Sequence, residues 1–79
     1  MADRPELPTQ FLSTHGAYSV MPDERGARWT IWDLDGCIGE ISWSDETWHS
    51  HPESPDIRPG EQDADHLIWE DAVAAVVAA

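Results

Sequence analysis

One stretch near the middle of the chain restricts the possible fold more than any other. Residues 28–34 alternate strand-favouring side chains, Asp35-Gly36 follows, and residues 37–44 return with a second run of the same kind. Alternation with period two is typical of a strand with two different faces. Asp-Gly between two such runs is a strong signal for a two-residue hairpin turn. The sequence therefore predicts two antiparallel strands joined at Asp35-Gly36.

The preceding residues extend this hairpin into a small sheet. Residues 16–21 mix aromatic, small and β-branched side chains and predict a further strand. The Pro- and Gly-containing residues 22–27 form a turn between that strand and residues 28–34. Residues 1–9 carry two prolines and little apolar content, which indicates a flexible N-terminal arm.

The second half of the chain predicts a loop and then a helix. Residues 45–65 are acidic and Pro-rich and predict a long loop, with Thr47–His49 as a candidate short strand. Apolar side chains then recur with helical period, so a helix is expected over residues 66–78 with Asp65 as its N-cap. The predicted fold is α+β: a small three-stranded antiparallel β-meander packed against one C-terminal α-helix, in a single domain over residues 10–79.

The charge of the chain narrows the class of partner. The chain has 79 residues and a net charge of −12, which disfavours direct binding to nucleic acid or to an anionic membrane. Residues 1–28 carry four acidic and three basic side chains, whereas residues 29–79 carry twelve acidic side chains and Arg58 alone. Such an uneven field favours a basic partner. The alternative is an acidic surface that serves only solubility.

Cysteine use and the absence of long apolar runs indicate the compartment. Cys37 is the only cysteine, so neither an internal disulfide nor a zinc site built on cysteines is predicted. The first ten residues lack the basic and then apolar profile of a signal peptide. No apolar run approaches the roughly 20 residues that a membrane-spanning helix needs. We therefore expect a soluble, cytoplasmic protein in a reducing environment.

The hairpin segment Trp32-Asp33-Leu34-Asp35-Gly36-Cys37-Ile38 resembles the first motif of the haloacid-dehalogenase phosphatases. This resemblance implies that Asp33 would be the nucleophile and Asp35 the acid and base. The family also has a much larger parallel α/β core and a cation, usually lysine, that holds the phosphate, and this chain has no lysine. Because phosphoryl transfer depends on charge neutralisation, the favoured interpretation is a hairpin turn, and a phosphatase is the third-ranked function.

Other patterns for catalysis or metal binding are weak. His49 and His51 are two residues apart, so they would share one side of an extended chain and are weak candidates for a metal site. Histidines in a surface loop are the favoured interpretation, and neither a metal nor a cofactor is predicted. No nucleophile elbow for a Ser–His–Asp hydrolase is present. Cys37 lies among carboxylates, which oppose thiolate formation.

The acidic residues suggest the most specific function. Several are spaced i, i+2, which places carboxylates about 6.6 Å apart in an extended chain, a separation similar to that of phosphates along a DNA strand. The chain thus resembles, in size and composition only, small acidic proteins that mimic DNA. Trp43 and Trp48 would supply aromatic anchors among the acids. The predicted acidic binding face comprises Asp33, Asp35, Asp45, Glu46, Glu53, Asp56, Glu61, Asp63, Asp65, Glu70 and Asp71.

The function predicted from the sequence is therefore a non-enzymatic protein-interaction module. It would inhibit, or act as an adaptor for, a basic nucleic-acid-binding protein, and its gene would belong to a phage or another mobile element. The runner-up is a structural or accessory protein that forms homo-oligomers, such as a homodimer, through the apolar face of its C-terminal helix. Salt distinguishes the two, because screening weakens a charged contact and leaves an apolar one intact.

Overall fold

Six antiparallel strands follow one another along the chain and pair in the same order within one sheet. The computed structural model describes residues 5–24, 26–53, 58 and 61–78. The strands are β1 (Gln10–Ser13), β2 (Gly16–Pro22), β3 (Arg28–Asp33), β4 (Gly36–Ser44), β5 (Thr47–Pro52) and β6 (Ala64–His66), and the helix α1 (Trp69–Ala78) follows them.

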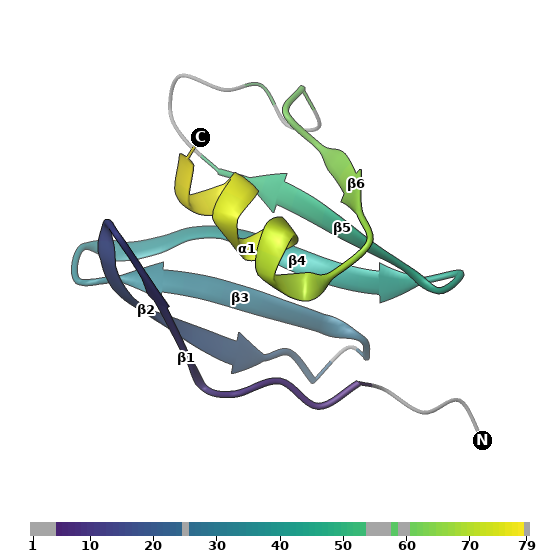
Figure 1. The fold of residues 1–79 in the computed structure, drawn as a ribbon, viewed down its shortest axis with the longest axis horizontal. Helices are drawn as coiled ribbons and strands as arrows, with labels where there is room; N and C mark the ends of the chain where they lie inside the picture. The colour runs from purple at the N-terminus through teal and green to yellow at the C-terminus, as the bar shows by residue number, and fades with distance from the viewer. Residues whose placement is uncertain (1–4, 25, 54–57, 59–60, 79) are drawn as a thin grey trace.

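The sheet curls around the helix to form a half-barrel (Figure 1). Helix α1 packs on β4, β5 and β6, and it also contacts β1 at the opposite edge of the sheet. A flat six-stranded sheet would not bring both edges to one helix, so the right-handed twist of the strands must accumulate into a curl. The buried core lies between the helix and this concave face and comprises Val20, Trp29, Ile31, Ile41, Trp48, Ala72, Val73 and Val76.

The hairpin that the sequence predicts at residues 28–44 is present as β3 and β4. Trp29 and Ile31 are buried on the helix side, whereas Trp32 is exposed on the other side of the sheet. The connecting residues are Leu34 and Asp35, one residue before the predicted pair Asp35-Gly36, and Gly36 begins β4 with φ +137°. Gly36 thus supplies the positive φ that the turn requires.

Strand β4 contains a bulge that lies close to helix α1. Ile31 pairs with Gly39 and Trp32 pairs with Cys37, so one extra residue is inserted into β4. Gly39 has φ +154°, and a Cβ atom there would lie 2.8 Å from Val76 Cγ1 on α1. The glycine therefore permits the sheet to bend against the helix.

The prediction of a three-stranded meander is wrong. The three predicted strands exist as β2, β3 and β4, and the sheet is completed by β1 before them and by β5 and β6 after them. The segment predicted as a loop contains β5 and the first two residues of β6, and the candidate short strand Thr47–His49 is the first half of β5. Residues 47–52 alternate inward and outward, but polar side chains lie on both sides. Composition rich in proline and acid concealed this alternation.

The predicted start of the helix is also wrong. Helix α1 begins at Trp69, three residues after the expected position, and Asp65 lies in β6 opposite His49 and is not an N-cap. Pairing of His66 with Trp48 keeps the chain extended where helical periodicity alone predicts a turn of helix. Residues 1–4 of the predicted arm lie outside the described residues, but Leu7 packs partly on the core and the Thr9 carbonyl accepts a hydrogen bond from Val20 N at 2.9 Å.

Candidate functional site

Asp33 and Asp35 lie together at the β3–β4 turn, and the side chain of Asp33 stabilises this turn. Its Oδ1 accepts hydrogen bonds from the backbone N–H groups of Asp35 at 2.7 Å and of Gly36 at 3.0 Å. An aspartate that caps its own turn in this way is common in hairpins. A hollow of about 260 Å³ beside the turn is lined by His15, Tyr18 and both aspartates, and its described lining includes no arginine. These contacts account for the motif without phosphoryl transfer.

The two tryptophans expected to act as anchors differ in burial. Trp48 is only 5% exposed and belongs to the core. Its ring lies between those of Trp29 and Trp43, with centroid separations of 5.3 and 5.0 Å. Trp48 is therefore not available to a partner in this fold, whereas Trp43 is half-buried and keeps part of its ring at the surface.

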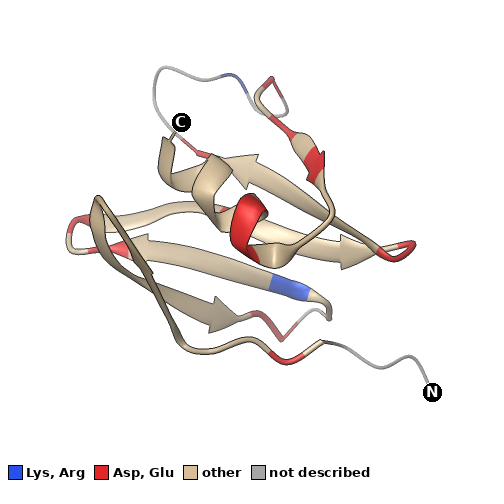
Figure 2. Ribbon diagram, in the orientation of Figure 1, with Lys and Arg blue, Asp and Glu red and all other residues tan. Residues whose placement is uncertain are grey.

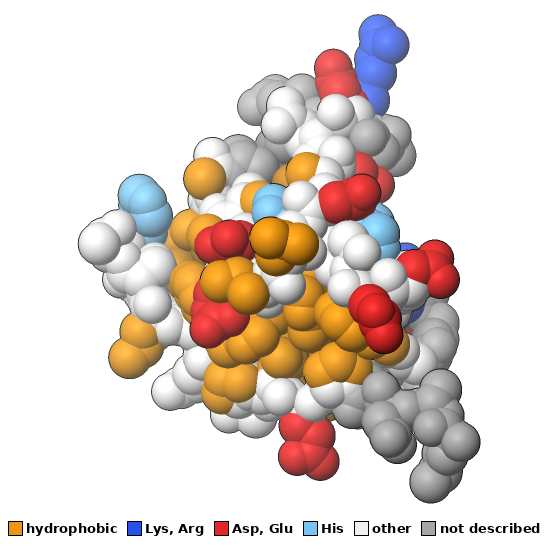
Figure 3. Space-filling model, turned by 45° about the vertical axis from the view of Figure 1, so that its right-hand side comes forward, with side chains coloured by type: hydrophobic (Ala, Val, Ile, Leu, Met, Phe, Trp, Pro, Cys, Tyr) orange, Lys and Arg blue, Asp and Glu red, His pale blue; other side chains and the backbone are white. Residues whose placement is uncertain are grey.

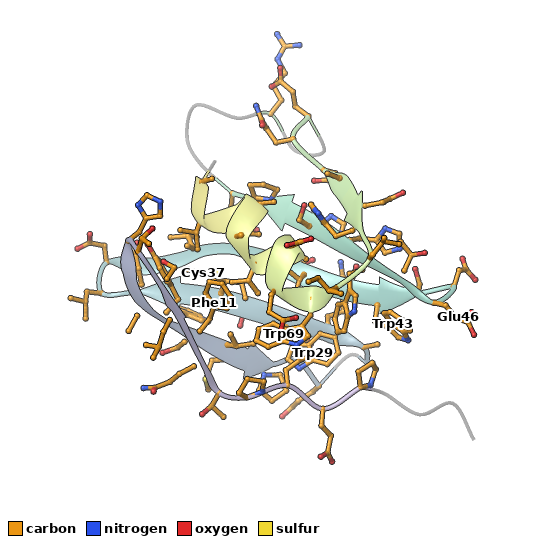
Figure 4. The ribbon with its side chains drawn as sticks, viewed as in Figure 1. Phe11, Trp29, Cys37, Trp43, Glu46 and Trp69 are labelled. Atoms are coloured by element: carbon orange, nitrogen blue, oxygen red, sulfur yellow. The ribbon has the colours of Figure 1, made fainter. Side chains whose placement is uncertain are left out.

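Large apolar side chains are exposed where the chain passes from β6 to α1. Leu67 is 92% exposed and Ile68 is 49% exposed. Trp69 follows, half-buried with its ring edge-on to Phe11 at 5.8 Å. Figure 4 shows Trp69 near Trp29 below the first turn of α1, with Trp43 farther toward Glu46. Figure 3 shows hydrophobic side chains gathered in one field on this side of the molecule, with carboxylates around them.

Four of the predicted acidic residues belong to the elements that carry these apolar side chains. Glu70 and Asp71 occupy the first turn of α1, where they also interact favourably with the helix dipole. Asp45 and Glu46 form the turn between β4 and β5 and are exposed. We call the combined region the acid-rimmed surface, and it comprises Trp43, Asp45, Glu46, Leu67, Ile68, Trp69, Glu70 and Asp71.

The other predicted acidic residues do not extend the acid-rimmed surface into one continuous acidic face. Figure 2 shows acidic residues at several separate turns and ends of the sheet. The first residue of β3 is Arg28. Asp33 and Asp35 lie at the β3–β4 turn, Glu53 follows β5, and Asp56 lies outside the described residues. The remaining three lie before or within β6, namely Glu61, Asp63 and Asp65. A continuous row of carboxylates that copies a DNA strand is therefore absent from the described part of the chain.

The apolar face of α1, which the homo-oligomer hypothesis requires, is already used within the chain. Ala72, Val73 and Val76 are at most 2% exposed and pack against the sheet. A second copy could not contact these side chains unless the helix left the sheet.

On the other face of the sheet, a serine, a histidine and an aspartate from three neighbouring strands or their ends form a hydrogen-bonded line. Ser42 Oγ on β4 lies 3.0 Å from His51 Nε2 on β5, and His51 Nδ1 lies 2.8 Å from Asp63 Oδ2 just before β6. A carboxylate can only accept, so Nδ1 carries the proton. In the neutral imidazole, Nε2 is then the acceptor of the Ser42 hydroxyl proton. We call this line the Ser42 relay.

The same arrangement is repeated two residues along the strands. Ser44 Oγ lies 2.9 Å from His49 Nε2, and His49 Nδ1 lies 2.7 Å from Asp65 Oδ1. We call this line the Ser44 relay. A third serine–histidine contact, between Ser50 Oγ and His66 Nε2 at 2.9 Å, lies on the helix side and satisfies the fully buried Ser50 hydroxyl.

A cation lies beside the first of these relays. Arg28 on β3 is the cross-strand partner of Ser42, and its Nη2 atom donates to Glu40 Oε1 at 2.6 Å. A guanidinium has five N–H donors, so this ion pair leaves further donors on Arg28. The outer face of β3 to β6 thus combines a cation, two hydroxyls and two histidine–aspartate pairs.

His49 and His51 share one side of β5, as expected for an i, i+2 pair in an extended chain. Each imidazole is bonded separately to its own serine and aspartate, so the rings do not converge on one point. Within the described ranges, no group of three or more histidine, cysteine or carboxylate side chains is placed to hold a metal ion.

Sequence reasoning missed Ser42 and Ser44 as members of the site. The signal was present as Ser-x-Ser and His-x-His on either side of residues 45–46. If those two residues form a tight turn, the serines and histidines fall on the same face of adjacent strands. The aspartates could not be assigned in the same way, because they lie 12 and 16 residues from their histidines.

Comparison with protein-family models, with curated proteins and with solved structures produced no match to this chain. The only helix among the described residues, α1, has 10 residues, and no helix in this part of the chain has the length and apolar character needed to cross a membrane.

Proposed function

We propose that the chain binds a basic, nucleic-acid-binding protein through the acid-rimmed surface and acts as its inhibitor or adaptor. The observation that carries this proposal is the exposure of Leu67 and Ile68, which directly precede the half-buried Trp69 and the acidic first turn of α1. Exposed apolar side chains gathered in one place are typical of a surface that contacts another protein. The acidic rim selects a partner with arginine or lysine around an apolar centre.

The turn of Asp45 and Glu46 gives independent support. Both residues have positive φ, 51° and 60° respectively. Two-residue turns of this kind favour Asn-Gly or Asp-Gly, and a residue such as glutamate in the left-handed region costs about 1–2 kcal/mol. The turn alone does not explain the glutamate. We assign Glu46 to the acidic rim, where its charge would face a basic partner.

The proposed partner also sets the expected location. Nucleic-acid-binding proteins that a small acidic protein could sequester are found in the cytosol. Cys37 is a free and exposed thiol, which suits a reducing compartment. We therefore include a cytoplasmic location in the proposal.

A defined peptide provides the first test. A labelled peptide of alternating leucine and arginine offers both apolar and basic contacts, and a glycine–arginine peptide of equal charge offers only the basic ones. We expect the first peptide to bind more tightly, with an affinity that falls steeply as salt rises. Leu67→Ser should weaken its binding about tenfold, which corresponds to about 1.4 kcal/mol. Fluorescence anisotropy measures each dissociation constant.

Leu34→Ser is the matched control, because Leu34 is as exposed as Leu67 but lies at the β3–β4 turn. Equal loss of binding in the two serine variants, or equal affinity for the two peptides, would overturn the proposal. The identity of the partner class is tested in nuclease-treated bacterial lysate. Proteins captured by the wild type should be released by duplex DNA and should not be captured by Leu67→Ser.

A further inference from the structure

The Ser42 relay has the connectivity of a nucleophile, a general base and a group that orients the base. We propose that Ser42 is the nucleophile of an acyl-transfer site that accepts acyl groups from uncharged carboxylic esters. This site lies on the face of the sheet opposite α1 and does not depend on the proposed binding function. It also departs from the non-enzymatic character expected from the sequence.

The contacts of the relay define the role of each side chain. Ser42 Oγ and His51 Nε2 are 3.0 Å apart, within the range for direct proton transfer. Asp63, at 2.8 Å from His51 Nδ1, fixes the tautomer that leaves a lone pair on Nε2. Asp63 is therefore a positioning residue, and His51 is the general base.

Arg28 distinguishes the Ser42 relay from the Ser44 relay. Arg28 and Ser42 are directly opposite each other on β3 and β4. An N–H group of Arg28 that is not used by Glu40 can face the negative charge that develops on an ester carbonyl oxygen. Strand β3 begins at Arg28, so no β3 side chain lies opposite Ser44. Ser42 is therefore expected to react and Ser44 is not.

The reaction balances without any further reactant than the ester and water. Ser42 Oγ bonds to the carbonyl carbon while His51 Nε2 takes the hydroxyl proton. The bond from that carbon to the leaving oxygen then breaks, and the departing alcohol receives the proton from His51. Acylated Ser42 remains. Attack by water, with the proton again passing through His51, releases the carboxylic acid and restores the hydroxyl.

A fluorophosphonate probe tests the nucleophile directly. Ser42 Oγ would form a bond to phosphorus, fluoride would leave, and the proton would pass to His51. We expect one probe per folded chain, mapped by mass spectrometry to Ser42, and no labelling after denaturation in urea. Ser42→Ala should abolish labelling, whereas Ser44→Ala should leave its rate within twofold of the wild type. Hydrolysis of p-nitrophenyl acetate provides a second readout, measured in a Cys37→Ala background to remove the exposed thiol.

Variants of the base and its partner distinguish chemistry from folding. His51→Gln should slow labelling at least a hundredfold, and Asp63→Asn at least tenfold, while Arg28→Lys should retain more activity than Arg28→Gln. Urea midpoints show whether each variant remains folded. Labelling that is absent from the wild type, that persists in Ser42→Ala, or that is unchanged in folded Asp63→Asn would overturn the proposal.

Discussion

Replacement of Gly39 by alanine tests how closely the helix and sheet are packed. The new Cβ would lie 2.8 Å from the His51 carbonyl oxygen, 2.8 Å from Val76 Cγ1 and 3.0 Å from Pro52 Cα. Two of these three atoms belong to the backbone of β5, so side-chain rotation cannot relieve the contacts. Overpacking of this kind costs about 1–3 kcal/mol, and a non-glycine residue at positive φ costs about 1–2 kcal/mol more.

A loss of about 2–5 kcal/mol is large for this chain, because a domain of 79 residues has a free energy of unfolding of about 4–12 kcal/mol. Urea denaturation measures the loss, and the melting temperature should fall by at least about 10 °C. Gly36→Ala is the matched control. Gly36 also has positive φ, but no atom lies within 4 Å of its would-be Cβ. If both variants lost the same stability, the close approach of α1 to the bulge would be refuted.

Two further changes test the hairpin turns. Asp33→Ala should lower the free energy of unfolding by about 1–2 kcal/mol, because two backbone N–H groups lose their acceptor; Asp33→Asn should restore most of this stability in urea denaturation, and an equal loss in both variants would contradict the turn assignment. Glu46→Gly should raise the free energy of unfolding by about 1 kcal/mol, and with it the urea midpoint, since glycine is unstrained at φ 60°. The same change should weaken binding of the leucine–arginine peptide. A lower midpoint would show that the side chain stabilises the turn.

The central hairpin could be predicted because the alternation of its side chains in the sequence matches their burial in the structure. The buried Trp29 and Ile31 alternate with residues that are half-buried or exposed, and Gly36 supplies the positive φ at the turn. Local patterning of this kind depends only on neighbouring residues. The three strands β2 to β4 therefore followed from the sequence in their correct order.

Strand β5 could not be identified in the same way, because its inward positions are not typical of a core. They are Trp48, Ser50 and Pro52, and the buried serine is tolerated because it lies 2.9 Å from His66 Nε2 on β6. The partner that satisfies Ser50 is 16 residues away. The preceding turn also lacks glycine, since Asp45 and Glu46 occupy positions that favour it. Tertiary contacts decided the structure here, and local propensity did not.

The candidate sites were predicted only in part for the same reason. His49 and His51 were singled out by their spacing, but their chemistry depends on Asp63 and Asp65, whose positions follow from the register of β5 and β6. Sequence reasoning assigned these aspartates to a solvent-exposed acidic face. In the structure both are exposed, and each also bonds to a histidine imidazole, a contact that no spacing along the chain reveals.

The β4–β5 hairpin contributes side chains to both proposed sites. Because its side chains alternate between the two faces of the sheet, the two sites can be tested separately. Trp43 and Trp48 pair on the helix side, while Ser42 and His49 pair on the opposite side. A side chain on one face can therefore be replaced without removing a contact on the other. Trp43 is the poor choice for this purpose, because its ring contacts Trp48 in the core.

Leu67 and Ser42 are the better pair of positions. Leu67 is almost fully exposed, and Ser42 can lose its hydroxyl with little change in volume. Changes at sites without shared partners have additive effects. A chain with both Leu67→Ser and Ser42→Ala should thus show the binding defect of the first variant and the labelling defect of the second. If either single change altered both properties, the two faces would be coupled through the hairpin and would constitute one site.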